Sequence, residues 1–223
     1  EREGELEESV LAAIALAVRL GTRFLNVLAG VAPAGMQPQR ALEVAATNLA
    51  RLAPAAEAAG VTLLVEAINN FDMPGYALPT IGDAAGVVRA VAHPSVGLQF
   101  DAYHVGRLGG DLIGEYDRQR SIVRHVQIAD VPGRHQPGTG SLPLKSFLEH
   151  LDELRRRGIP VVPLTSKTEA EGAHLAYRRA RRQVGAEQRR QPFPGAARQR
   201  KQARVAPRLV QRPAVEDDAG DAA

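Results

Sequence analysis

The sequence predicts an α/β protein built on a parallel β-sheet. Segments with apolar residues at helical spacing alternate with short apolar runs rich in β-branched residues along most of the chain. The 223 residues are 44% hydrophobic and 24% charged, which is enough apolar material for the core of one large globular domain. Alternation of this kind favours strands that run parallel, each connected to the next through a covering helix. We expect this domain to occupy residues 1–182.

The first elements follow this pattern closely. Residues 6–21 have helical spacing, and residues 23–30 form a short apolar run of strand character. Residues 37–60 predict a second helix, in which Pro54 predicts a kink or a break because proline lacks the N–H that a helix interior needs. Residues 61–70 are strongly β-branched and end on polar side chains, which is typical of a strand that leaves the core.

The same alternation continues through the second half of the domain. Further helices are predicted over residues 81–94, 111–120, 143–158 and 168–183. Further strands are predicted over residues 96–104, 124–131 and 159–164.

Composition excludes several kinds of chemistry. The sequence contains no cysteine, so disulfides, thiolate nucleophiles and cysteine-ligated zinc are excluded. No run of about 18 apolar residues occurs, and residues 1–10 are acidic, unlike a secretory signal. We therefore expect no membrane span and a cytoplasmic location. The first residue is Glu1 and not Met, so we expect the natural chain to begin earlier.

The basic character of the sequence is confined to its C-terminal end. Residues 178–223 contain 12 Lys and Arg against 5 Asp and Glu, whereas residues 1–177 contain 16 against 20. The Arg, Gln, Pro and Ala of residues 183–223 show no apolar periodicity and predict a disordered basic tail. Phe193 is the only aromatic residue there that could stack on a base, so we favour a solvated tail over a nucleic-acid-binding arm.

Polar side chains gather where three consecutive predicted strands end. They are Glu66 and Asn69 in the first strand, Asp101 and His104 in the second, and Gln127 and Asp130 in the third, followed by Arg134 and His135 in a loop. The carboxyl ends of parallel strands meet at one edge of the sheet, so we expect these groups to converge. Converging oxygen ligands suit Mg²⁺ or Mn²⁺, and a histidine shifts the preference toward Mn²⁺.

Three of these residues also have a plainer alternative role. Either Glu66 or Asp101 alone could cap the loop that follows its strand, although two carboxylates in equivalent positions are harder to explain in this way. Arg134 could pair with a carboxylate at the same edge or clamp an anionic substrate, and the sequence leaves both open.

Three long motifs carry a resemblance to a known family. They are "LLVEAINNFDMPGYALPT", "VGLQFDAYHVGRLGGDL" and "HVQIADVPGRHQPGTGSLPL". Together they resemble the hydroxypyruvate isomerase branch of the xylose isomerase-like TIM-barrel superfamily, over about residues 5–154. The resemblance implies a partial (β/α)8 TIM barrel with about five of its eight strands present.

The resemblance also implies an activity and a set of site residues. The activity is the interconversion of hydroxypyruvate and tartronate semialdehyde through an enediolate stabilised by Mg²⁺ or Mn²⁺. The implied catalytic residues are Glu66 and His104, the implied metal ligands are Glu66, Asp101 and Gln127, and the implied substrate-binding residues are Asn69, Arg134 and His135. The alternatives are a 2-oxo-tetronate isomerase of the same branch and a noncatalytic metal-binding remnant of the barrel. The expected partner is a small hydroxy-oxo acid, and a homo-oligomer is left open.

The sequence departs from the family pattern at both ends. The resemblance begins at a helix that normally follows the third barrel strand, which implies that three βα units of about 30 residues each are missing. After about residue 154 the pattern changes, and no acidic residue lies between Glu153 and Glu169, where the family carries its second catalytic glutamate.

Overall fold

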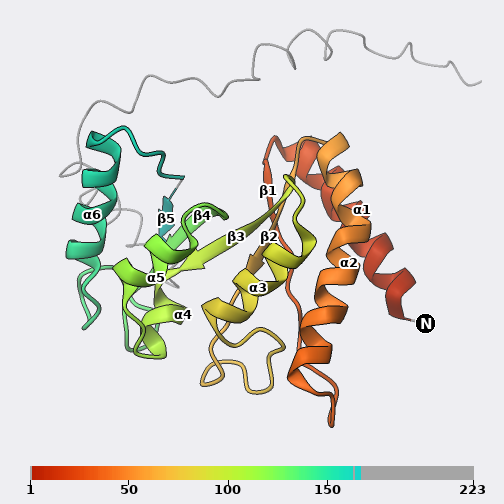
Figure 1. Ribbon diagram of the computed structural model, residues 1–223, viewed down its shortest axis with the longest axis horizontal. Helices are drawn as coiled ribbons and strands as arrows, with labels where there is room; N and C mark the ends of the chain where they lie inside the picture. The colour runs from red at the N-terminus through yellow and green to blue at the C-terminus, as the bar shows by residue number, and fades with distance from the viewer. Residues whose placement is uncertain (1, 163, 167–223) are drawn as a thin grey trace, which may run out of the picture. The chain divides into compact units, whose positions relative to one another are not determined.

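The computed structural model describes residues 2–162 and 164–166. In this part of the chain five parallel strands form one sheet in the order in which they occur in the sequence. The strands are β1 (Phe24–Asn26), β2 (Thr62–Glu66), β3 (Val96–Asp101), β4 (Val123–Ile128) and β5 (Leu164–Ser166). The predicted α/β class and parallel sheet are confirmed, and the curved sheet is half of a barrel (Figure 1).

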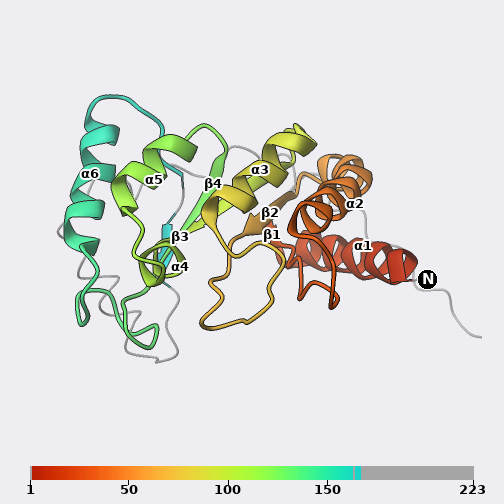
Figure 2. The same cartoon turned by 60° about the horizontal axis from the view of Figure 1, so that its bottom comes forward.

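Helices cover one side of this sheet. They are α1 (Arg2–Leu20), α2 (Pro38–Ala58), α3 (Ile81–Val91), α4 (Ala102–Arg107), α5 (Leu112–Gln119) and α6 (Leu144–Arg156). The longer helices follow one another in chain order along the sheet, with α1 and α6 at opposite ends of the row (Figure 2). A doubly wound sheet would reverse its strand order and carry helices on both faces, so this winding is that of a TIM barrel.

The structure decides three points about individual elements. Of the kink or break predicted at Pro54, the break is excluded, because helix α2 runs through this residue. His104 was expected on a strand, but β3 ends at Asp101 because its carboxylate accepts a hydrogen bond from Tyr103 N at 2.9 Å and thereby caps α4. The last strand was expected from residue 159, but Pro160 cannot donate to a strand ladder, and β5 begins at Leu164.

Two further predictions fall on other parts of the chain. The helix expected over residues 168–183 and the tail expected over residues 183–223 lie outside the described residues. Within residues 2–162 and 164–166, each helix is too short or too polar to cross a membrane.

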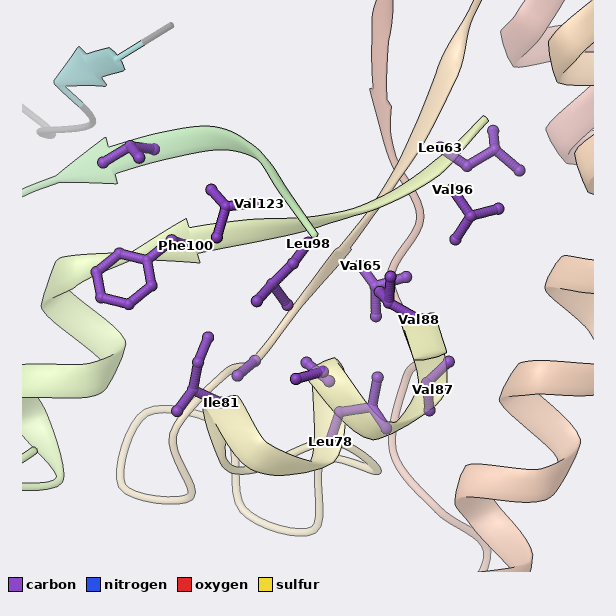
Figure 3. Packing of buried hydrophobic residues seen from close by; sticks show 14 of the residues in the cluster. Leu63, Val65, Leu78, Ile81, Val87, Val88, Val96, Leu98, Phe100 and Val123 are labelled. Atoms are coloured by element: carbon purple, nitrogen blue, oxygen red, sulfur yellow. The ribbon is translucent and has the colours of Figure 1, made fainter. Parts of the chain in front are cut away.

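The sheet has an apolar outer face and a polar inner face. Leu63, Val65, Leu98 and Phe100 belong to a buried apolar cluster that also includes Ile81, Val87 and Val88 of α3 (Figure 3). Strand register pairs Glu66 with Gln99 and Asp101 with Gln127, so these alternate residues share the opposite face. All six residues of β3 are buried, including Gln99 and Asp101 on the inner face.

An aromatic cluster joins the sheet to its last two helices. Phe100 of β3 lies edge-on to Tyr116 of α5, with ring centroids 5.5 Å apart. Phe147 of α6 stacks on Phe100 at 5.6 Å and meets Tyr116 at 5.7 Å. The rings of Phe100 and Phe147 are fully buried, so this cluster holds β3, which ends in Asp101, against the helical layer.

Truncating the cluster is expected to destabilise the protein strongly. Phe100→Ala should lower the free energy of unfolding by about 3–5 kcal/mol, because it removes a buried ring and leaves a cavity. Phe71→Ala is the matched control, since Phe71 is 64% exposed, and it should cost about 1 kcal/mol or less. Urea unfolding monitored by circular dichroism measures both, and equal losses would contradict this account of the core.

Candidate metal and substrate site

Three buried side chains converge at the carboxyl ends of β2 and β3. Glu66 is the last residue of β2, Asp101 is the last residue of β3, and His104 lies in the first turn of α4. One potential ligand atom from each residue lies within 4.8 Å of the others. Two carboxylates and an imidazole at this spacing form a donor set that suits a divalent cation.

Asn26, at the end of β1, extends this group and was missed by the sequence analysis. Its amide Nδ2 donates a hydrogen bond to Glu66 Oε2 at 2.6 Å. Its Oδ1 is buried and has no hydrogen-bond partner among the described residues. The sequence feature that could have indicated Asn26 is its position as the polar last residue of a strand. Glu66 and Asp101 occupy the same position in their strands.

Asp101 is held by two donors in an otherwise unfavourable environment. Tyr103 N donates to Oδ1 at 2.9 Å, and Arg134 Nη2 donates to Oδ2 at 2.5 Å. The pKa of Asp101 is raised to about 7, chiefly by burial and next by the charge of the neighbouring Glu66, while Arg134 acts to lower it. A cation bound between the carboxylates would relieve the same repulsion.

His104 is positioned by Asn69, which lies just past β2 and is completely buried. Asn69 Nδ2 lies 2.7 Å from His104 Nδ1, and the backbone N–H of Asn69 donates to the same ring nitrogen at 3.4 Å. On the other side of the ring, His104 Nε2 lies 3.9 Å from Asp101 Oδ2. The structure therefore brings Asn69 to the site through its contact with the histidine.

Gln127 lies beside the three-residue group on the next strand. It is in register with Asp101 on one side and with Thr165 of β5 on the other. Its amide oxygen accepts a hydrogen bond from Gln99 Nε2 at 3.1 Å. A ligand role for Gln127 stays a prediction, since this amide is already engaged by its neighbour.

The loop after β4 brings Arg134 to the site. Arg134 has a left-handed backbone with φ of 58°, a conformation that costs a non-glycine residue about 1–2 kcal/mol. Its guanidinium pairs with Asp101 and lies over the Tyr103 ring, 5.1 Å from the centroid. Of the two alternatives for Arg134, the structure shows the pairing with a carboxylate, while its Nε remains buried without a hydrogen-bond partner among the described residues.

The other polar residues of this loop have different surroundings. Asp130 is buried, and its carboxylate accepts hydrogen bonds from the backbone N–H groups of Val131, Gly138 and Leu142. Asp130 therefore shapes the loop from within. His135 is exposed and exchanges backbone hydrogen bonds with Asp130, and its role in substrate binding stays a prediction.

The arrangement of the strands and of the site residues defines the class of the protein. Parallel strands wound as half a barrel, with carboxylates at their carboxyl ends, are typical of a TIM-barrel enzyme. Residues 1–182 match the xylose isomerase-like TIM barrel family, and the chain belongs to this family.

Named relatives share this family and are longer than this chain. The chain is 36% identical over 153 residues to 2-oxo-tetronate isomerase of Cupriavidus necator, a match that covers 69% of this chain and 59% of that protein. It is 35% identical over 141 residues to hydroxypyruvate isomerase of Escherichia coli K12, covering 63% and 55%. The chain thus spans somewhat more than half the length of these relatives.

Solved structures show the same fold. A crystal structure of a family 2 AP endonuclease from Brucella melitensis has a TM-score of 0.68 and 30% identity, covering 77% of this chain and 65% of that one. The IolI protein, whose structure is described with a bound zinc atom, has a TM-score of 0.65 at 18% identity, covering 81% and 68%. The second likeness concerns the fold alone.

The buried Asp101 is expected to make the protein less stable as pH rises. The pKa of Asp101 is about 7 in the folded protein against 3.8 in the reference state. The folded state therefore holds this proton more tightly, and stability falls as pH increases between these two values. Asp101→Asn should remove this slope. Between about pH 4 and pH 8, the free energy of unfolding of the variant should therefore rise by on the order of 2–4 kcal/mol relative to that of the unsubstituted protein.

Urea unfolding in the presence of a chelator measures this difference. Asp111→Asn is the matched control, because Asp111 also caps a helix, accepting from Ile113 N at 3.1 Å, but is exposed. This control should follow the pH dependence of the unsubstituted protein. If Asp101→Asn also followed it, burial would not be perturbing Asp101.

Proposed function

We propose that this chain carries the metal- and substrate-binding part of an isomerase that acts on a small hydroxy-oxo acid. The observation that carries this proposal is the buried group of Glu66, Asp101 and His104 at the carboxyl ends of adjacent parallel strands. Support comes from relatives of the same family that are named hydroxypyruvate isomerase and 2-oxo-tetronate isomerase. The preferred reaction is the interconversion of hydroxypyruvate and tartronate semialdehyde.

The residues present fit a divalent cation, for which we propose Mg²⁺ or Mn²⁺. Glu66 and Asp101 would hold it through carboxylate oxygens, with Gln127 as a further oxygen ligand. The raised pKa of Asp101 supports this fit, since its largest cause is burial and its second is the charge on Glu66. When bound, such an ion polarises the substrate carbonyl and stabilises negative charge on its oxygens.

Glu66 is proposed to move the proton between the two carbons. The carbonyl shifts when a base takes a proton from the carbon that bears the hydroxyl group and returns it to the neighbouring carbon. A hydroxyl proton moves between the two oxygens at the same time. The Asn26 hydrogen bond to Glu66 Oε2 fixes the orientation of this carboxylate, which would keep it aligned with both carbons.

Arg134 is proposed to bind the substrate carboxylate together with His135. The guanidinium has one arm on Asp101 and a buried Nε without a hydrogen-bond partner among the described residues. An incoming carboxylate supplies the acceptor that this Nε lacks, and guanidinium and carboxylate groups pair well in geometry and charge.

Two alternatives are each favoured by one observation. A 2-oxo-tetronate substrate is favoured by the name of the relative from Cupriavidus necator. A noncatalytic metal-binding protein is favoured by β5, which consists of Leu164, Thr165 and Ser166 and so contributes no carboxylate beside Gln127. Turnover of a four-carbon acid in preference to hydroxypyruvate selects the first, and metal binding without turnover selects the second.

Removing the Glu66 carboxylate is expected to abolish both functions of the site. Glu66→Gln should weaken Mn²⁺ binding at least about tenfold and lower any isomerisation rate by about 10²-fold to 10⁴-fold. Glu149→Gln, an exposed glutamate on α6, is the control and should leave both unchanged. Calorimetric titration with Mn²⁺ and conversion of hydroxypyruvate followed by NMR measure the two effects, and unchanged Mn²⁺ binding in Glu66→Gln would refute the ligand assignment.

Chelation is expected to stop turnover reversibly. Treatment with EDTA should remove isomerase activity because the substrate carbonyl then loses its polarising ion, and added Mg²⁺ or Mn²⁺ should restore it. Ca²⁺, a larger ion with longer bonds to oxygen, is a useful comparison and should restore less. Full activity in excess EDTA would contradict a metal role.

A further inference from the structure

Helix α1 carries more apolar surface than its packing in the single chain buries. Residues 10–18 read VLAAIALAV, a stretch without a polar side chain, and a helix that is apolar on all sides is typically surrounded by protein. In this stretch only Val10, Ile14 and Ala17 are buried, where α1 packs on α2 and β1. Of the eight large apolar side chains that are exposed among the described residues, four belong to α1. Exposed apolar surface that is concentrated in this way is typical of a contact with another molecule.

The outward side of α1 is formed by residues that recur at helical spacing. They are Glu8, Leu11, Ala12, Ala15, Leu16 and Arg19, and all six are exposed. We call these six residues the α1 face. The buried Val10, Ile14 and Ala17 occupy the opposite side of the helix, and Glu7 is held toward α2 by an ion pair with Arg51 at 2.8 Å. The rotation of α1 about its axis is thereby fixed, and the α1 face is directed away from the sheet.

The α1 face is complementary to itself in the antiparallel direction. Its residues are arranged symmetrically about the midpoint between residues 13 and 14. If a second α1 runs in the opposite direction across this midpoint, the alanines of the two faces lie opposite each other, and Leu11 of each copy lies opposite Leu16 of the other. At both ends, Glu8 of one copy lies opposite Arg19 of the other. Apolar groups therefore meet at the centre, and opposite charges meet at the ends.

Charge also selects the direction in which two such helices pair. A parallel pair would place Glu8 beside Glu8 and Arg19 beside Arg19, and both contacts are repulsive. An antiparallel pair removes this repulsion and places the positive end of each helix dipole beside the negative end of the other. The small side chains of Ala12 and Ala15 at the centre allow the two helix axes to approach closely.

We infer that the α1 face is a docking surface for a second copy of this chain, in which antiparallel α1 helices pack together with a Glu8–Arg19 ion pair at each end. The self-complementary order of the six residues identifies the occupant, because each group on the face meets its match on an identical face. Helix α1 stands at the end of the row of helices (Figure 2), and the α1 face lies on the outside of this row. The inferred contact is therefore separate from the site at the carboxyl ends of the strands.

The strength of this association follows from its size. One helix from each copy forms an interface at the low end of the range for specific complexes, so we expect a reversible dimer with a dissociation constant of about 1–100 µM. Sedimentation velocity of the full chain over about 1–200 µM measures this equilibrium directly. A protein that stays monomeric over this whole range would overturn the inference.

Leu16→Glu tests whether the α1 face is the surface involved. The substitution places a carboxylate in the apolar centre of the interface twice, once from each copy, and should leave only monomer in the same concentration range. Leu16 is 50% exposed, so the fold should persist, and circular dichroism checks this. A dimer that forms unchanged in Leu16→Glu would place the interface elsewhere and overturn the inference.

Charge reversal tests the antiparallel pairing itself. Glu8→Arg places Arg opposite Arg19, and Arg19→Glu places Glu opposite Glu8, so each variant alone should weaken the dimer about tenfold. An equimolar mixture of the two variants restores opposite charges at both ends and should return the affinity to within about threefold of the original. A mixture that associates no better than the single variants would overturn the inference.

Two substitutions on α6 are the matched controls for these reversals. Glu149→Arg and Lys145→Glu make the same changes of charge at exposed positions of another helix. Both variants should dimerise like the unsubstituted protein. If they weakened the dimer as much as Glu8→Arg and Arg19→Glu, the effect would come from net charge, and the assigned pairing would be wrong.

Discussion

The site depends on keeping two carboxylates, Glu66 and Asp101, buried next to each other. Burial of an anion is costly, and a second anion nearby increases the cost. Hydrogen bonds from charged and polar partners offset the free-energy cost of this burial. Asn26 donates to Glu66, while Arg134 and Tyr103 N donate to Asp101. These partners come from β1, from the loop after β4 and from α4, so much of the polar structure around the sheet is arranged about this pair.

The fold makes such a pair possible because the two faces of the sheet have different roles. The outer face is packed against helices and supplies the hydrophobic stabilisation, anchored near Asp101 by the rings of Phe100, Tyr116 and Phe147. The inner face is therefore released from packing the helices and can carry Gln99, Gln127 and the carboxylates. Strands that end at the same edge then bring their last residues together, which is why a few positions suffice to build the site.

Loops hold the remaining groups in place with side-chain hydrogen bonds. Asp130 organises the loop after β4 by accepting three backbone hydrogen bonds, and this loop presents Arg134. Asn69 organises the turn after β2 in a similar way, and that turn presents the amide that orients His104. In both cases a buried polar residue at a strand end fixes a loop, and the loop fixes a side chain of the site.

The sequence by itself determined the sheet, its parallel strands and the edge at which function gathers, because these follow from local periodicity and from the polar residues that end apolar strands. It also determined the family, through the long motifs around Glu66, Asp101 and Gln127. Element ends were less well determined: His104 moved from a strand to a helix because the Asp101 side chain caps that helix, an interaction that periodicity does not record.

Only the tertiary structure decided which polar groups meet. Asn26 and Glu66 are 40 residues apart, Asn69 and His104 are 35 apart, and Arg134 and Asp101 are 33 apart. Sequence patterns place each residue at a strand end or in a loop, but hydrogen bonds between such distant residues depend on strand register and loop path. The contacts of Asn26 with Glu66 and of Asn69 with His104 depend on that register and path, and for that physical reason the sequence indicated neither contact.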